Sequence, residues 1–532
     1  MTSHSSPRVL TEDLGGTPLS RAAREDLVPP EWYAVRPTNA AAWRTRARDV
    51  AKSAPKAWLE ALEPAIVARG AAAERLTRVA REGGVLITTG QQPGFLGGAL
   101  LTLAKALSAI ALADVIEKET SVAVAPLFWA ATDDADFEES RGAQIAVTGG
   151  VETLRIEQTP RAGTPMAQAM LGDVSREIAR LEEACGSVVD TRVLEQLRAS
   201  YRSTATIGDA YVSFLRAVLE PLGMPVLDAS HASVRRAAAP LLKRALERAS
   251  DVNAALEQRN SDIVAAGFRP QVDSTPDLSL VFTQENGEKR RLPISEASRA
   301  LRETSVELLS PNVLLRPVIE RSILPTIAYV AGPGEIAYFA QVSAVARGLD
   351  AAQPLAVPRW STTIVEPRIS RLLDRLHADI DDMRDPHAVE TRLAHALVPR
   401  QVSDAMRDLR RDVERGVASL EVADDDTLVP SASLQGLRRW MLHRLERLER
   451  RYGAAIKRRE AHIMRDVATA RGALFPDGVR QERALAYVPF LARYGEPLVR
   501  DMLAQATSHA SRLVLGSEIG VSAERARATS RS

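Results

Sequence analysis

The residues best suited to chemistry form an acidic segment at positions 133–139. Five carboxylates stand within these seven residues, directly after the apolar run 122–131. Carboxylates this close repel one another unless something cationic lies between them, so an amine or a metal ion such as Mg²⁺ is the predicted partner. The alternative is that Glu138 and Glu139 form only the acidic first turn of a helix. The residues predicted to hold the cation or to deprotonate the amine are Asp133, Asp134 and Asp136.

A glycine-bearing loop at residues 90–98 is predicted to bind an anion. It lies between the short β-branched run 85–89 and a helix predicted over 99–118, where unpaired backbone N–H groups and the positive helix end attract carboxylate or phosphate. Lys105 could point back from the helix toward the same place. The alternative is a plain turn with solvated glutamines, and the loop lacks the ending of a Walker motif. The predicted binding residues are Gly90, Gln91, Gln92, Gly94 and Gly98.

A third loop, at residues 332–335, matches the Gly-x-Gly-x-x-Ala dinucleotide fingerprint between a predicted strand and a predicted helix. The next strand ends at Arg359 and not at an acidic residue placed for a ribose, so we do not predict a nicotinamide cofactor. We interpret the loop as a second anion site at a helix start, with Glu335 available to a hydroxyl or an amine. Arg316 and Arg359 could bind carboxylate or phosphate, or could instead be surface arginines. The loop glycines assigned to this site are Gly332 and Gly334.

Predicted strands and helices alternate from residue 85 to residue 357, after a helical pattern that runs to about residue 80. A hairpin of residues 143–147 and 153–157 is inserted on the way. This alternation is typical of a parallel sheet with helices on both faces, where ligands bind outside the carboxyl ends of the strands. The strands are expected at 85–89, 122–131, 224–228, 326–330 and 354–357.

Strand signals end near residue 368, and two helical stretches follow. Their apolar residues are spaced by threes and fours over 402–420 and 434–467, before and after a loop that contains Asp424 and Asp426. This heptad-like seam predicts an antiparallel coiled coil, whose charge-dense stretch 438–459 is interpreted as a solvated face. The predicted organisation is a catalytic core with insertions over 1–367, the coiled coil over 368–475, and a segment over 476–532 that packs back on the core or the coiled coil.

Composition excludes several classes of protein. The 532 residues are 45% hydrophobic and 26% charged, with 69 basic against 68 acidic residues, so no net field attracts nucleic acid or anionic lipid. The polar N-terminus and the lack of an apolar run of ~20 residues predict a cytoplasmic protein. The single cysteine, Cys185, is expected to be structural, and no zinc site is expected. None of the eight histidines lies in the three loops, which argues against a Ser-His-Asp hydrolase.

Several short blocks occur together over about residues 85–500. They are 89–94, 128–129 with the acidic segment, 312 with 316–317, 332–341, 481–483, 489–490 and 493–495. In this order they resemble the bacillithiol biosynthesis cysteine-adding enzyme family. The resemblance implies a Rossmann-like core related in shape to class I aminoacyl-tRNA synthetases and nucleotidyltransferases, helical insertions, and a homodimer formed through the coiled coil. It further implies addition of L-cysteine to glucosaminyl-malate, the last step to bacillithiol, and substrate-binding roles for Trp129, Asn312 and Tyr338.

The chain departs from the pattern of this family at one position. Where the family usually shows Gly-Glu-Asp-His-Asp, residues 132–136 keep the acids but carry Ala135 in place of the histidine, which suggests a slower or altered paralogue. The signature loops of the synthetases are also absent, so the use of ATP rests on analogy. Two other functions stay open, namely a nucleotidyltransferase or ligase acting on another amino sugar and a dimeric scaffold without activity.

Overall fold

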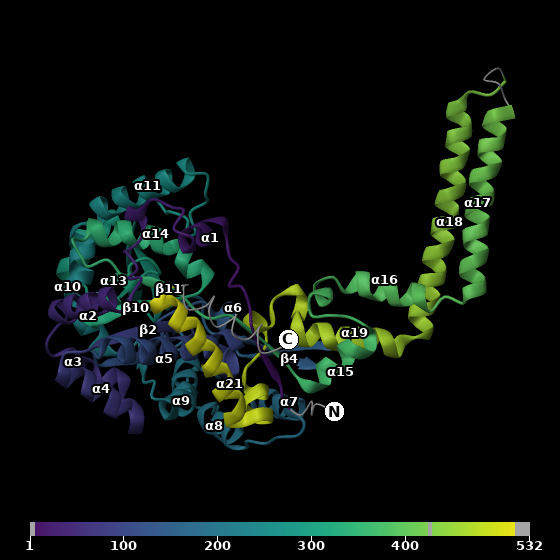
Figure 1. Cartoon of the computed structure of the whole chain (residues 1–532). Coiled ribbons are helices and arrows are strands. Elements are labelled where there is room, and N and C mark those ends of the chain that lie inside the picture. The colour runs from purple at the N-terminus through teal and green to yellow at the C-terminus, as the bar shows by residue number, and fades with distance from the viewer. Residues whose placement is uncertain (1–5, 424–427, 517–532) are drawn as a thin grey trace. The chain divides into compact units, whose positions relative to one another are not determined.

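The computed structural model describes residues 6–423 and 428–516 (Figure 1). Contacts within the chain divide it into two units. The first, called the α/β unit below, comprises 7–145, 153–364 and the chain from 482 onward; the second, called the helical unit, is formed mainly by 365–481. The predicted loop acids Asp424 and Asp426 lie outside the described residues.

A five-stranded parallel sheet forms the centre of the α/β unit, in the order β11-β10-β2-β3-β6. Strand β3 is buried along its whole length and β2 is buried except at its last residue, because helices cover both faces. The prediction of a Rossmann-like core is therefore confirmed, and each predicted strand is present. The strands are β2 Val85–Gln91, β3 Val124–Ala130, β6 Val226–Asp228, β10 Thr326–Ala331 and β11 Ala356–Pro358.

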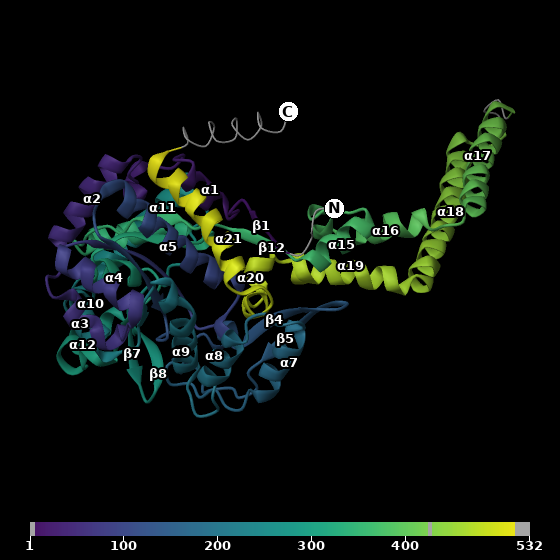
Figure 2. The ribbon, with the colours of Figure 1, turned by 60° about the horizontal axis from the view of Figure 1, so that its bottom comes forward.

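Helices connect these strands and cover the sheet. Helix α5 is buried along most of its length, and the C-terminal helix α21 packs along it (Figure 2). Helix α14 follows β10 directly, and α10 packs against α13. These helices are α5 Leu100–Thr120, α9 Ile207–Leu219, α10 Ala232–Glu247, α11 Ala249–Ala265, α13 Arg316–Ile323, α14 Pro333–Gly348 and α21 Val488–Leu515.

The N-terminal segment is more divided than its helical pattern predicts. It begins with a strand, β1, that pairs with β12 near residue 362. Trp43 and Trp58 lie on two helices because the chain leaves the helical conformation at Ala54, just before Pro55. The elements are β1 Arg8–Thr11, α1 Pro18–Arg24, α2 Ala40–Ser53, α3 Trp58–Ile66, α4 Gly70–Glu82 and β12 Thr362–Val365.

Two further β elements are inserted into the α/β unit. The hairpin predicted across Gly149 and Gly150 is confirmed as β4 and β5. The sequence analysis missed a three-stranded antiparallel sheet in the order β8-β7-β9, because β8 consists mostly of charged residues and shows no apolar alternation. These elements are β4 Gly142–Val147, β5 Gly150–Arg155, α7 Ser175–Cys185, α8 Arg192–Ser200, β7 Leu278–Glu285, β8 Glu288–Pro293, α12 Ala297–Glu303 and β9 Leu309–Pro311.

The helical unit contains the predicted antiparallel coiled coil, formed by α17 and α18 (Figure 1). One part of the prediction is wrong: the second helix ends at Arg459, because Glu460 has non-helical backbone angles, and α19 continues from there. No helix among the described residues has the length and hydrophobicity needed to cross a membrane. The helices of this unit are α15 Pro367–Leu376, α16 Pro386–Ala396, α17 Arg400–Ala423, α18 Ser431–Arg459 and α19 Ala461–Leu474.

Only part of the predicted seam is covered within one chain. Its buried members are Val413, Val417, Leu445 and Ile456 on α17 and α18, and Val467 on α19. Other seam residues remain between 39% and 50% exposed, and they are Leu409, Leu420, Leu437, Leu448 and Tyr452. The pair of helices therefore leaves part of its apolar stripe in contact with solvent.

A charge placed in the buried part of the seam is expected to separate α17 from α18. Leu445→Asp should cost about 2 kcal/mol or more, because even truncation of a buried leucine costs that much and a buried charge adds to it. Amide hydrogen exchange of α17 and α18 should become about 30-fold faster. Val422→Asp is the control, since Val422 is 85% exposed on the same hairpin. Equal protection in both variants would contradict the assigned seam.

Candidate functional site

A cavity of about 1220 Å³ lies at the carboxyl ends of β2, β3 and β10. The chain first adds β3 and β6 on one side of β2 and then returns to add β10 and β11 on the other side. The loops after β2 and β10 therefore leave the sheet in opposite directions, which is the crevice where open α/β sheets bind ligands. Gly90, at the end of β2, and Gly332, just after β10, both line the cavity.

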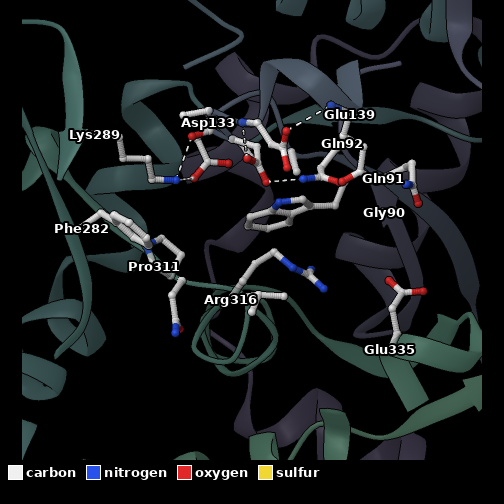
Figure 3. A pocket seen from close by; sticks show the side chains of 18 of the residues that line it. Gly90, Gln91, Gln92, Asp133, Glu139, Phe282, Lys289, Pro311, Arg316 and Glu335 are labelled. Carbon is white, nitrogen blue, oxygen red and sulfur yellow. Dashed lines mark hydrogen bonds and ion pairs between the residues drawn. The ribbon is translucent and has the colours of Figure 1, made fainter. Parts of the chain in front are cut away.

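Most of the residues predicted from the sequence meet in this cavity. They come from segments that are far apart in the chain, and Figure 3 shows several of them around one space. The predicted residues that line it are Gly90, Gln91, Gln92, Lys105, Trp129, Asp133, Asp134, Asp136, Asn312, Arg316, Gly332, Gly334, Glu335, Tyr338 and Arg359.

The structure does not bring Gly94 and Gly98 to the cavity. A Cβ atom added at Gly94 would lie 2.6 Å from the Cα atom of Gly98, so the two glycines allow the loop to fold tightly on itself. Gly98 also has a φ of 85°, a conformation that glycine adopts without strain. These two glycines serve the turn, and the prediction that they admit a ligand has no support in the geometry.

The start of α5 is also occupied by the protein itself. The N–H of Leu100 donates to the carbonyl oxygen of Leu485 at 2.8 Å, and Ala99 forms a β-bridge with Ala486. The first free donor of the helix is thus satisfied by a segment nearly 400 residues away in sequence, which no local pattern could reveal. The anion site predicted at this helix start is not formed there.

A buried network joins the loops after β2 and β10. Lys105 Nζ lies 2.7 Å from the carbonyl oxygen of Gly90 and 2.7 Å from Oε2 of Glu335. Glu335 also accepts hydrogen bonds from the hydroxyl of Tyr329 and the N–H of Gly332, each at 2.6 Å. Both oxygens of Glu335 are thus engaged within the protein, whereas the sequence analysis left them available to a hydroxyl or an amine. Its carboxylate instead caps the start of α14.

Burial and pairing act in opposite directions on the ionisation of this pair. Burial lowers the pKa of Lys105, and the charge of Glu335 offsets part of that effect. Burial alone would raise the pKa of Glu335, but Lys105, with the hydrogen bonds from Tyr329 and Gly332, lowers it below its usual value. The carboxylate is therefore ionised at neutral pH, and the ammonium is its compensating charge.

Arg359 is buried and the side chain of Arg316 is only 14% exposed, so neither is a surface arginine. Arg316 donates to Oε2 of Glu320 at 2.6 Å, lies 4.9 Å from the ring centre of Tyr329, and borders the cavity. Arg359 makes its bidentate contact with Glu482, at 2.8 and 2.6 Å, rather than leaving that fork for a ligand. Arg316 is thus the better placed of the two to contact a substrate.

The carboxylates of the acidic segment point in different directions. Asp133 faces Lys289 at 3.5 Å and Arg235 at 3.8 Å. Asp134 accepts from the side-chain amide of Gln92 at 2.6 Å and from the N–H of Asp136 at 2.9 Å. Asp136 itself caps the four-residue helix α6, Phe137–Ser140. Among residues 6–423 and 428–516, no group of three metal-ligating side chains could hold a metal ion.

Glu138 and Glu139 both border the cavity, but only Glu139 contacts the other residues of the site. Glu138 is exposed and pairs with Arg141, as expected for a residue in the first turn of a helix. Glu139 hydrogen bonds with Gln92, which therefore bridges it to Asp134 (Figure 3). Partial burial and the charges of Asp136 and Asp134 raise the pKa of Glu139. A carboxyl group with a raised pKa is suited to accept and return a proton.

Sequence reasoning missed most of the cationic lining. Lys289 and Arg291 come from β8, a strand that was not predicted, and Arg235 comes from α10. Arg483 lies in one of the family blocks, which is the signal that could have identified it. The run of basic residues at 289–291 was the available sign for β8, but an exposed loop would carry the same run.

Comparison with known proteins identifies relatives over both parts of the chain. Residues 28–360 match the family described as bacillithiol biosynthesis BshC, N-terminal Rossmann-like domain, and residues 362–514 match its C-terminal coiled-coil domain. Proteins named "Putative cysteine ligase BshC" are similar to this chain. The one from Solibacter usitatus is 33% identical over 79% of this chain and 82% of its own length. Those from Koribacter versatilis and Salinibacter ruber are each 29% identical, over 82% and 79% of this chain and 84% and 80% of their own lengths.

The buried pair of Arg359 and Glu482 is expected to be important for stability. Glu482→Gln should lower the free energy of unfolding by about 3 kcal/mol or more, because it leaves a buried guanidinium without its counter-charge. Burial alone would raise the pKa of Glu482, but its contacts with Arg359 lower it. The pair therefore contributes fully to the stability at a pH above about 4.3, the pKa of a glutamate in the unfolded chain. This contribution is lost as the pH falls through the lowered pKa of Glu482 in the folded protein.

Urea unfolding of the wild type and Glu482→Gln over a range of pH measures both expectations. Glu496→Gln is the control, because Glu496 forms an exposed pair with Arg500 that contributes little. A stability difference for Glu482→Gln as small as that of the control would show that the pair is not the anchor proposed here.

Proposed function

The chain belongs to the bacillithiol biosynthesis BshC family, and from that premise we propose that it is a ligase that joins L-cysteine to glucosaminyl-malate in the cytoplasm to form bacillithiol. The name of its relatives, cysteine ligase, supports the reaction class. The cavity, with a volume of about 1220 Å³, would hold both small substrates together.

One observation carries the proposal: the cavity presents both carboxylates and cations to a ligand. Asp134 and Glu139, bridged by Gln92, form an acidic wall, while Lys289 and Arg235 lie around Asp133. A reaction that joins an amine to a carboxylate needs to hold one group of each sign. The acidic wall would hold the sugar ammonium, and Glu139, with its raised pKa, would accept the proton lost on attack.

Formation of the amide requires activation of the cysteine carboxylate, and ATP is the activator that we propose by analogy with the synthetase-like core. The carboxylate would attack the α-phosphorus of ATP and release pyrophosphate. The amine nitrogen would then attack the carbonyl carbon, lose one proton and expel AMP. Mg²⁺ would accompany ATP through its phosphates, and no step is assigned to a metal held by the protein alone, since the described carboxylates diverge.

We also propose that two copies of the chain form a homodimer through the coiled coil. The exposed seam residues on α17 and α18 are Leu409, Leu420, Leu437, Leu448 and Tyr452. They are apolar at heptad-like positions where a two-helix hairpin cannot cover them, and a second hairpin would bury them.

The reaction is tested by incubating the purified protein with L-cysteine, glucosaminyl-malate and ATP and measuring bacillithiol by thiol chromatography. Asp134→Asn should lower the rate by ~10²-fold without a change in melting temperature, because it removes a charge from the acidic wall. Asp114→Asn is the control, since Asp114 lies on the outer surface of α5 and pairs with Arg75. Ala135→His should raise the rate if the family histidine assists.

The same assay separates the other candidate functions. A ligase on another amino sugar would make no bacillithiol but would show pyrophosphate exchange with ATP. An inactive scaffold would show neither reaction and no rise in melting temperature with any substrate. Bacillithiol formation at an equal rate in the wild type and Asp134→Asn would remove the catalytic role of the acidic wall.

The dimer is tested by light scattering. Leu437→Asp should convert a species of about twice the chain mass into one of the chain mass, because Leu437 is 41% exposed and would face the second hairpin. Arg438→Asp, at the next and exposed position, should leave the mass unchanged. A wild type that scatters as a single chain would refute the homodimer.

A further inference from the structure

The unpredicted strand β8 places two cations in the cavity. Successive side chains of a strand point to opposite faces, so Lys289 and Arg291 share one face and Arg290 takes the other. Lys289 and Arg291 line the cavity. Arg290 instead pairs with Glu285 at 2.8 Å and Glu296 at 3.0 Å and is 39% exposed. β8 thus carries two cations that face the cavity and a third, Arg290, that faces away and can serve as a control in mutagenesis.

These two cations and Arg235 form what we call the cationic corner of the cavity. Lys289 Nζ donates to the backbone carbonyl of Asp133 at 2.8 Å and lies 4.8 Å from the ring centre of Phe282. Arg235 donates from Nη1 to the carbonyl oxygen of Leu309 at 2.7 Å. Its Nε is buried and has no hydrogen-bond partner among the described residues. Arg291 donates from Nε to the carbonyl oxygen of Ser279 at 2.7 Å, so each of the three cations is anchored to a backbone carbonyl.

The charges of the corner do not cancel. Lys289 and Arg235 face one carboxylate, that of Asp133, and Arg291 lines the same cavity, so these four side chains carry a net charge of +2. Burial alone would raise the pKa of Asp133, but Lys289 and Arg235 lower it. The carboxylate is therefore ionised, and the net charge of +2 includes it. Its contacts of 3.5 and 3.8 Å are too long to satisfy the donors of both cations. Because these side chains are only 12–13% exposed, the excess charge is poorly screened.

We propose that Lys289, Arg235 and Arg291 form the subsite that binds a dianion, the two carboxylates of the malyl group of glucosaminyl-malate. This inference rests on the proposed function. A net charge of +2 matches two carboxylates, and the guanidinium groups can bind them in a bidentate manner. In Figure 3 Lys289 and Glu335 lie at opposite sides of the view, with Gln92 and Glu139 on the acidic wall near Asp133. A substrate anchored in the corner would direct its amino sugar toward that wall.

Phosphate groups of a nucleotide share the same charge, so the experiment compares both ligands. Lys289→Met should raise the KM for glucosaminyl-malate, and its Kd by calorimetry, by about 10- to 100-fold while kcat changes little, because one charge-assisted contact is lost. Methyl glucosaminide, which lacks the carboxylates, should bind the wild type and Lys289→Met equally, and so should ATP. Arg290→Met should behave as the wild type, and Lys289→Arg should restore most of the affinity.

Each other outcome overturns the assignment. A loss of ATP affinity with unchanged glucosaminyl-malate affinity would make the corner a phosphate site, and an equal loss for methyl glucosaminide would show a general distortion. If the wild type does not bind glucosaminyl-malate, the proposed function fails on its own. L-malate is then the probe: binding that is lost in Lys289→Met but kept in Arg290→Met supports the corner, whereas no binding to the wild type refutes it.

Discussion

The geometry of the cavity depends on one buried ion pair, that of Lys105 and Glu335. A lysine inside an apolar helix is costly unless it is paired, and its partner lies at the start of the helix that follows β10. Lys105 also contacts the carbonyl oxygen of Gly90, at the end of β2. The pair therefore connects the two loops that diverge at the switch point of the sheet. It adds to the direct pairing of β2 with β10, and Arg316, stacked on nearby Tyr329, lies in the same network.

The core and its insertions contribute different chemistry to the cavity. The ends of β2 and β3 supply the loops that carry Gln92, Asp134 and Glu139, which form the acidic wall. The cations Lys289 and Arg291 come from the inserted antiparallel sheet, which is not part of the parallel core. A fold can keep one reaction while an insertion sets the substrate, because function resides in sites that are added to folds. In the proposed site, β8 and Arg235 of α10 would select the acceptor, rather than the strands of the core.

The features predicted correctly are those with a local signal. The core strands are nearly continuous apolar runs, and the coiled coil repeats its apolar residues every three or four positions, so both were predictable. The errors depend on distant contacts. Leu100 is satisfied by Leu485, and Glu335 is engaged by Lys105, so neither helix start is open as predicted. β8 is charged because it lines a cavity, which removes the alternation by which strands are recognised.

The replacement of the family histidine by Ala135 narrows how this site can move a proton. Ala135 lines the cavity, and no histidine is among the described residues that do. Proton transfer then falls to a carboxyl group, and Glu139 has its pKa raised by burial, Asp136 and Asp134 toward the range where it can act as a base. The carboxylates of the acidic wall favour the charged form of a bound amine, so they hold the ammonium but also raise its pKa. Glu139 would therefore accept the proton as the new bond forms, in place of an imidazole.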